Sequence, residues 1–344
     1  MTTLNSVLIV DDEPAVRDIM SRWVTSLGLH VKTAATADEA LATLRGRHYD
    51  MAVIDVMMPG RDGLWLASQL EREHPHTAVV IATSDTYLVE SRAENPEVAD
   101  RPIADFLVKP FHRDRFALAV DRGRQWRKQS LEELQWHARL GFEVRDRTDE
   151  ISSLVRERRM AGVPEIDALL AITTDRVPET MAHSERVARY AQSVGRKLRI
   201  DHATTPLLDI AAKLHDVGKA AMPEALLTKP SPLTDGEVTI MRRHVDAGAE
   251  ILMSTTTLAE AAPIVHASHE WFGGNGYPLK LAGSAIPLAS RIISVVDAYD
   301  AMTQDRHYRT HLSSADATAE LLRSCPAQFD PEIVDAFLAV LGGN

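Results

Sequence analysis

The sequence predicts two domains of different class. The first is an α/β domain with a doubly wound, parallel five-stranded sheet, and the second is an all-α helical bundle, with a long helical linker between them. Short apolar runs alternate with amphipathic stretches over residues 1–122, whereas residues 164–344 show only helical patterns broken by proline and glycine. Strand–helix alternation is typical of a parallel sheet with helices on both faces. The 344 residues suit two domains, because domains usually have about 100–200 residues.

Five apolar runs mark the strands of the first domain. They are Val7–Val10, Met51–Ile54, Ala78–Ala82, Phe106–Val108 and a weaker run near His30–Thr33. Amphipathic stretches between them, such as Pro14–Leu27 and Leu64–Glu73, read as helices. In a parallel sheet of this kind, the active site lies beyond the carboxyl ends of the strands.

Polar residues stand at the ends of four of these strands. They are Asp11 and Asp12, Asp55, Thr83 and Lys109. We expect them to meet at one rim of the sheet. Three carboxylates repel one another unless a cation joins them, and hard oxygen ligands suit Mg²⁺. A carboxylate beside Mg²⁺ can attack phosphorus, while a lysine neutralises the transferred phosphoryl group.

This pattern resembles the receiver domain of two-component response regulators, over roughly residues 5–125. The resemblance implies that a sensor histidine kinase is a partner and that Asp55 is the phosphorylated residue. It also implies that Thr83 and Lys109 contact the phosphoryl group. Asp11, Asp12 and Asp55 are the residues that would hold Mg²⁺.

The linker, residues 123–163, contains no proline and is rich in Arg, Glu and Gln. This composition predicts a helix that leaves the first domain and continues to the second. Leu140, Val144, Ile151 and Leu154 fall near a heptad spacing. Two interpretations stay open, a solvated helix without a partner and a short dimeric coiled coil, so a homodimer is an alternative.

Histidines stand beside carboxylates in the second domain. Glu179 and His183 are four apart and share a helix face, and His215-Asp216 closes an apolar helix. Asp297 lies in an apolar stretch, where an unpaired carboxylate is costly. Imidazole and carboxylate without thiolate suit Fe, Mn or Zn. The full candidate metal-ligand set is Glu179, His183, His215, Asp216, His244, His269 and Asp297.

Together, His183, His215-Asp216 and Asp297 resemble the signature of the HD phosphohydrolase superfamily, and His244 with the loop Gly276-Tyr277-Pro278 narrows it to the HD-GYP family. The resemblance implies a helical bundle with two or three transition-metal ions, iron or manganese, that hydrolyses cyclic di-GMP to pGpG or GMP. Glu179 matches the extra acid of the three-metal subset. The implied catalytic residues are Lys219 and Asp216. The implied substrate-binding residues are Lys219, Gly276, Tyr277, Pro278, Arg306 and Arg309.

The chemistry explains these residue types. Two metals about 3.5–4 Å apart lower the pKa of a bridging water and clamp a phosphodiester, and Lys219 would offset charge in the transition state. Tyr277 has two open roles, stacking on guanine or packing within the protein.

Two positions depart from the family pattern. Ser268 replaces a histidine and Gly273 replaces an aspartate, so one metal site lacks a strong donor. The main interpretation is an active phosphodiesterase. The alternatives are a degenerate module that binds cyclic di-GMP or a partner protein without hydrolysis, and hydrolysis of another nucleotide.

Composition sets further expectations. The net charge of −11 disfavours DNA as a partner. The single cysteine, Cys325, excludes an intramolecular disulfide, and no apolar run approaches the roughly 20 residues that span a bilayer. With no signal peptide recognised, we expect a cytoplasmic protein without membrane contact. Diguanylate cyclase (GGDEF) proteins are further candidate partners.

Overall fold

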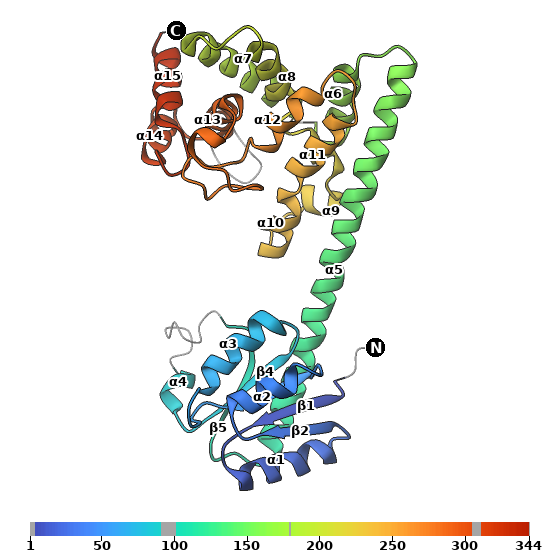
Figure 1. The fold of residues 1–344 in the computed structure, drawn as a ribbon, viewed down its shortest axis with the longest axis vertical. Helices are drawn as coiled ribbons and strands as arrows, with labels where there is room; N and C mark the ends of the chain where they lie inside the picture. Colours follow the sequence, from blue (N-terminus) through green and yellow to red (C-terminus); the bar gives the residue numbers. More distant parts are fainter. Residues whose placement is uncertain (1–3, 91–100, 179, 305–310, 344) are drawn as a thin grey trace. The chain divides into compact units, whose positions relative to one another are not determined.

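Residues 4–90, 101–178, 180–304 and 311–343 are described by the computed structural model (Figure 1). The chain divides into two units, Met1–Trp136 and His137–Asn344. The expected fold classes are confirmed, since a parallel sheet with helices forms the first unit and helices form the second.

The first unit alternates strands and helices in the expected order. Its elements are β1 (Ser6–Val10), α1 (Pro14–Ser26), β2 (His30–Ala34), α2 (Ala37–Leu44), β3 (Met51–Asp55), α3 (Gly63–Glu73), β4 (Ala78–Thr83), α4 (Thr86–Glu90), β5 (Ile103–Val108) and the first part of α5 (Arg113–Met160). The sheet order is β2-β1-β3-β4-β5, and every strand pair is parallel.

Strands β1, β3 and β4 are buried on both faces, and their successive side chains point to opposite sides of the sheet. Val7 and Ile9 of β1 pack into one core with α1 and α5. Leu8 and Val10 pack into the other core with α2, α3 and α4. This arrangement explains the continuous apolar runs. It also leaves the strand ends as the place where polar side chains gather.

Helix α5 is a single helix of 48 residues. Its later part belongs to the second unit, where Leu140, Val144 and Ile151 are buried. The guanidinium of Arg243 donates to the carbonyl of Gly141. Leu140, Val144 and Ile151 therefore pack within the chain, whereas Leu154 of the same pattern is exposed. A homodimer stays a prediction.

The second unit continues with α6 (Glu165–Arg176), α7 (Thr180–Leu198), α8 (Thr204–Leu214), η1 (Val217–Ala221), α9 (Glu224–Leu227), α10 (Asp235–Arg242), α11 (His244–Met253), η2 (Ala259–Ala261), α12 (Ala262–His266), η3 (Gly283–Ala285), α13 (Leu288–Thr303), α14 (Ser314–Arg323) and α15 (Pro331–Gly342). Here α and η denote α- and 3-10 helices. Helices α7, α8 and α13 pack on one another and carry much of the apolar core.

Two helical segments are shorter than their sequence patterns suggest. The pattern over 235–253 is broken at Arg243, which separates α10 from α11. Beside this break the backbone of His244 packs closely on Gly218, where a Cβ would lie 1.9 Å from the carbonyl oxygen of His244. The pattern over 258–270 yields only the short helix α12, which leaves His269 in a loop.

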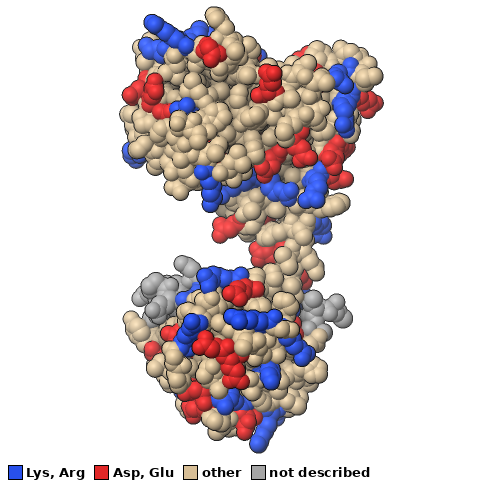
Figure 2. Space-filling view, viewed as in Figure 1, with Lys and Arg blue, Asp and Glu red and all other residues tan. Residues whose placement is uncertain are grey.

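Acidic and basic side chains are interspersed on the face seen in Figure 2. That face has no broad field of a single sign, the feature that attracts polyanions. Among the described residues, no helix is both long and apolar enough to cross a membrane.

Candidate functional site

The strand ends of the first unit form an acidic pocket. Asp11, Asp12 and Asp55 offer carboxylate oxygens that all lie within 4.8 Å of one another. The Nζ atom of Lys109 lies 2.8 Å from Oδ2 of Asp11 and 3.0 Å from Oδ1 of Asp55. Thr83 ends the neighbouring strand and is fully buried. The structure thus brings together the residues expected at this rim.

Burial and charge act in opposition in this pocket. Burial raises the pKa of the Asp55 carboxyl, and Lys109 only partly offsets the rise. Burial alone would lower the pKa of Lys109, but its hydrogen bonds to Asp11 and Asp55 outweigh that and raise it. Three carboxylates face one ammonium, so the pocket has an excess of oxygen donors and negative charge. This donor set fits a hard divalent cation such as Mg²⁺.

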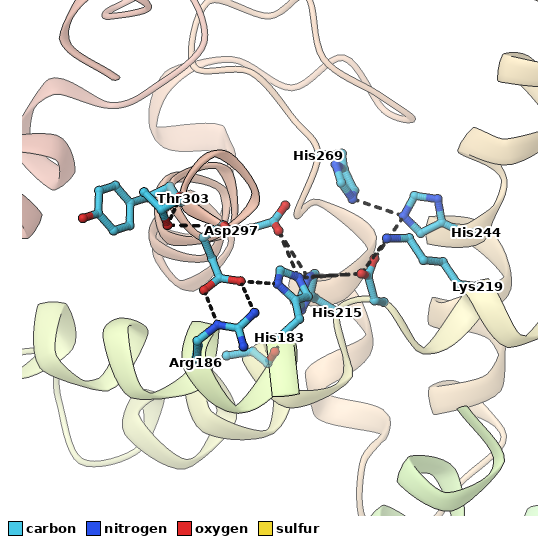
Figure 3. Close-up of polar contacts among 12 residues, drawn as sticks. His183, Arg186, His215, Lys219, His244, His269, Asp297 and Thr303 are labelled. Atoms are coloured by element: carbon cyan, nitrogen blue, oxygen red, sulfur yellow. Dashed lines mark hydrogen bonds and ion pairs between the residues drawn. The ribbon is translucent and has the colours of Figure 1, made fainter. Parts of the chain in front are cut away.

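The second unit gathers histidines and aspartates from separate elements. His183 lies on α7, His215 and Asp216 follow α8, and Asp297 lies on α13. His244 is the first residue of α11, and His269 lies in the loop after α12. In Figure 3 the labelled side chains of His183, His215, His244 and His269 turn toward a common space, into which Asp297 and Lys219 also reach.

The first group surrounds His183. Its Nε2 atom lies 3.2 Å from Oδ1 of Asp297 and 3.3 Å from Nε2 of His215. Oδ2 of Asp216 is 3.9 Å from Nε2 of His183 and 3.7 Å from Nε2 of His215. Two helices, α7 and α13, and the turn after α8 therefore supply four potential ligands to one point.

The second group shares Asp216 with the first. Oδ1 of Asp216 lies 3.8 Å from Nε2 of His244, and this Nε2 lies 3.1 Å from Nε2 of His269. Oδ2 of Asp216 faces the first group and also receives Lys219, whose Nζ is 2.6 Å away. Asp216 thus stands between the two groups with one oxygen on each side.

Hydrogen bonds on the outer ring nitrogens fix the direction of the inner ones. Nδ1 of His215 is 2.9 Å from the carbonyl oxygen of Ala212, and Nδ1 of His244 is 2.9 Å from that of Met241. A carbonyl only accepts, so each Nδ1 carries the proton and each Nε2 carries a lone pair. Lone pairs of imidazoles that face each other at about 3 Å call for a cation between them. The residues present therefore fit divalent metal ions.

The pKa values of the second group agree with this. Burial and the neighbouring His269 lower the pKa of His244 to about 3, and burial lowers that of His269. Both are thus neutral near pH 7, the form that binds metal. Burial alone would lower the pKa of His183, but Asp297 and Asp300 raise it to about 9. A divalent cation at Nε2 would take the place of that proton.

The loop that carries Gly276, Tyr277 and Pro278 packs on His269-Glu270. The Glu270 carboxylate accepts hydrogen bonds from the backbone N–H groups of Leu279 and Leu281, at 2.6 and 3.0 Å. A Cβ at position 276 would lie 2.2 Å from the backbone nitrogen of Trp271, so only glycine fits. Glu270 thus organises this loop, a role that the sequence analysis missed.

The ring of Tyr277 already has partners. It stacks on His269 with ring centroids 5.1 Å apart and an interplanar angle of 7°. The guanidinium of Arg242 lies over the ring, 5.0 Å from its centroid. Burial raises the pKa of Tyr277 to about 12. These contacts favour packing over guanine stacking.

The two departures from the family pattern have local explanations. The hydroxyl of Ser268 donates to the carbonyl of Val265 at 2.8 Å and is buried. A Cβ at Gly273 would lie 2.8 Å from the carbonyl oxygen of Ala327, which leaves no room for an aspartate without a shift. The nearby His266 does not replace the missing imidazole, because its Nε2 atom lies 2.8 Å from Oδ1 of Asp246.

Three predicted residues, Glu179, Arg306 and Arg309, lie outside the described residues. Two further residues that the sequence analysis did not assign, Arg186 and Asp300, lie directly beside the centre. Their signal was the spacing of three residues from the candidate ligands His183 and Asp297 on the same helices.

Comparison with known proteins identifies both domains. Residues 7–121 match the response regulator receiver domain and residues 167–333 match an HD domain. The chain is 30% identical to the cyclic di-GMP phosphodiesterase response regulator RpfG of Xanthomonas campestris, over 97% of this chain and 87% of that protein. This chain belongs to the same family of HD-domain response regulators.

Two other relatives are also named as phosphodiesterases. A cyclic di-GMP phosphodiesterase of Thermotoga maritima is 29% identical over 97% of this chain and 89% of its own length. A 3'3'-cGAMP-specific phosphodiesterase of Vibrio cholerae is 35% identical over 46% of this chain and 31% of its own length.

Proposed function

We propose that this response regulator hydrolyses cyclic di-GMP at a metal centre in its second unit, and that phosphorylation of Asp55 controls the reaction. The observation that carries the proposal is the convergence of four imidazoles and two carboxylates with Asp216 at their middle. A divalent-metal site is what an HD domain implies. The relatives over the full length of the chain are named for cyclic di-GMP.

Two ions account for the described ligands. His183, His215, Asp216 and Asp297 would hold one ion, and Asp216, His244 and His269 would hold the other. Bound divalent cations supply Lewis acidity toward a phosphodiester and lower the pKa of water. The nitrogen and oxygen donors without thiolate fit iron, manganese or zinc. Of these we propose iron or manganese, the ions that the resemblance to HD-GYP proteins implies. A third ion would require Glu179.

Lys219 is the proposed electrostatic catalyst. Its Nζ reaches Asp216, and its side chain is 31% exposed, so it remains accessible to a substrate phosphate. A positive charge at this place stabilises the negative charge that develops on the phosphate in the transition state. We further propose substrate contacts from Gly276, Pro278, Arg306 and Arg309. Tyr277 would act by holding His269 and the loop.

We propose that the first unit receives the regulatory signal as a phosphoryl group. Asp55 would accept a phosphoryl group from a sensor histidine kinase with Mg²⁺ held by Asp11, Asp12 and Asp55, while Lys109 and Thr83 contact the transferred group. A cleft of 570 Å³ opens beside Asp12, Asp55 and Lys109, which gives a phosphodonor access.

The deciding experiment measures turnover of cyclic di-GMP by the full chain loaded with Mn²⁺ or Fe²⁺. Chromatography identifies the product as pGpG or GMP, and 3'3'-cGAMP serves as the competing substrate. The variant with both His215→Ala and Asp216→Ala controls for contaminating activity. We expect hydrolysis that favours cyclic di-GMP. Binding of cyclic di-GMP without turnover under either metal would identify a degenerate receptor, and faster turnover of 3'3'-cGAMP would reassign the substrate.

A further inference from the structure

His183 lies between two carboxylates of one helix. Its Nε2 atom faces Oδ1 of Asp297 at 3.2 Å, and its Nδ1 atom faces Oδ2 of Asp300 at 2.7 Å. The two aspartates are three residues apart on α13 and so share a helix face. One imidazole is thus contacted at its inner nitrogen by a candidate metal ligand and at its outer nitrogen by a carboxylate outside the ligand set.

Asp300 is held in place from a second side. Its side chain is only 2% exposed, and Arg186 donates two hydrogen bonds to it, Nε to Oδ1 at 2.6 Å and a terminal nitrogen to Oδ2 at 2.9 Å. Arg186 is three residues after His183 on α7. A planar guanidinium that grips both carboxylate oxygens leaves the carboxylate little rotational freedom.

We propose that Asp300, oriented by Arg186, is a positioning residue for the metal ligand His183. A carboxylate that accepts the Nδ1 proton fixes the tautomer, turns the Nε2 lone pair toward the ion and makes the imidazole a stronger donor. The other two imidazoles whose Nδ1 contacts are known rest on backbone carbonyls. His183 is therefore the ligand whose donor strength depends on a replaceable side chain.

The alternative is that the Asp300–Arg186 pair only ties α7 to α13. A second aspartate–arginine pair, Asp330 and Arg291, serves as the structural comparison. Asp330 bonds to Arg291 at 2.5 Å with side chains 6% and 17% exposed, and it caps α15 through the backbone nitrogen of Glu332. Both aspartates are buried and both bond to an arginine. In each pair one member lies on α13, Asp300 in the first pair and Arg291 in the second.

The test is a titration of the metal-free full chain with Mn²⁺ alone, for the wild type, Asp300→Asn and Asp330→Asn. The amide in Asp300→Asn keeps the shape but loses the charge that strengthens His183. We expect Mn²⁺ affinity at one of two sites to fall about 10–100-fold in Asp300→Asn, with wild-type affinity in Asp330→Asn. Circular dichroism checks that each variant is folded.

Arg186→Lys is the second variant, chosen because the side chain of Arg186 is 27% exposed and its replacement disturbs the core less. Lysine keeps the charge but loses the two-point grip, so we expect a smaller loss of affinity at the same site. If Asp300→Asn does not fold, this variant decides. Wild-type Mn²⁺ affinity in a folded Asp300→Asn or, failing that, in Arg186→Lys would overturn the proposal, as would an equal loss in Asp330→Asn.

The inference rests on the proposed metal role of His183, but its readout is separate from hydrolysis. Weakened Mn²⁺ binding in a protein that does not cleave cyclic di-GMP would support the positioning role and count against the proposed activity. If the wild type hydrolyses cyclic di-GMP and Asp300→Asn binds Mn²⁺ with wild-type affinity, the proposed activity is supported and the positioning role is contradicted.

Discussion

The two polar pockets of this chain are built on opposite plans. The pocket of the first unit consists of three carboxylates and a lysine, all at the carboxyl ends of β1, β3 and β5. The pocket of the second unit mixes four imidazoles with carboxylates and draws them from α7, α11, α13, the turn after α8 and the loop after α12. Hard oxygen donors suit Mg²⁺, whereas imidazole with carboxylate suits transition ions.

The difference teaches how each scaffold sets donor direction. In the sheet, parallel strands end at one edge, so side chains that follow β1 and β3 meet without any further device. Helices bring distant residues together without such a rule. The second pocket therefore depends on outer hydrogen bonds, such as Nδ1 of His244 on the carbonyl of Met241, to aim each ligand.

The largest effect should come from removing the shared ligand of the helical pocket. In the variant with His215→Ala and Asp216→Ala, both proposed metal groups lose a member, because Asp216 belongs to each. We expect elemental analysis to find most of the metal gone and cyclic di-GMP hydrolysis abolished. Full metal content in this folded variant would show that the metal ligands lie elsewhere, and the contrast between the two pockets would then fail.

The counterpart in the sheet pocket is Asp55→Asn. The amide cannot form an acyl phosphate, so labelling by a small phosphodonor such as acetyl phosphate should be lost. The metal content of the helical pocket should stay at the wild-type level, because its donors lie in the other unit. Labelling that persists in Asp55→Asn would show that another residue accepts the phosphoryl group.

Lys219→Met separates metal binding from catalysis within the helical pocket. Removing the charge beside Asp216 should lower kcat by about 10²–10³-fold, while metal content is retained because lysine is not a ligand. Lys213→Met is the matched control, since Lys213 pairs with Asp209 on α8. Metal loss in Lys219→Met, or an equal fall of kcat in the control, would contradict this role.

Ser268→Ala should have the smallest effect. The hydroxyl bonds to the carbonyl of Val265, so its loss should lower the free energy of unfolding by about 1 kcal/mol and leave metal affinity unchanged. Ser290→Ala is the control, because Ser290 makes a similar buried bond to the carbonyl of Ile264 at 2.7 Å. Urea unfolding and Mn²⁺ titration test both. Weaker metal binding in Ser268→Ala alone would make Ser268 a ligand.

The helical pocket was predicted less completely than the sheet pocket. The motif identified which histidines and aspartates to group, but helix packing determined which atoms face one another. Glu270 and Arg242 gave no separate sequence signal of their contacts. The close approach of Gly218 to the carbonyl of His244, beside the break between α10 and α11, likewise joins segments far apart in the chain.

The sequence by itself determined the two fold classes and the rim pocket of the first unit. Alternation of apolar runs and helices is a local pattern, and the parallel direction of the strands that it implies places Asp55 and Lys109 at the same edge. Only the tertiary structure decided that Asp300 supports His183 and that Tyr277 stacks on His269. These contacts join side chains on elements far apart in the chain, and their geometry depends on how the helices pack rather than on any local period.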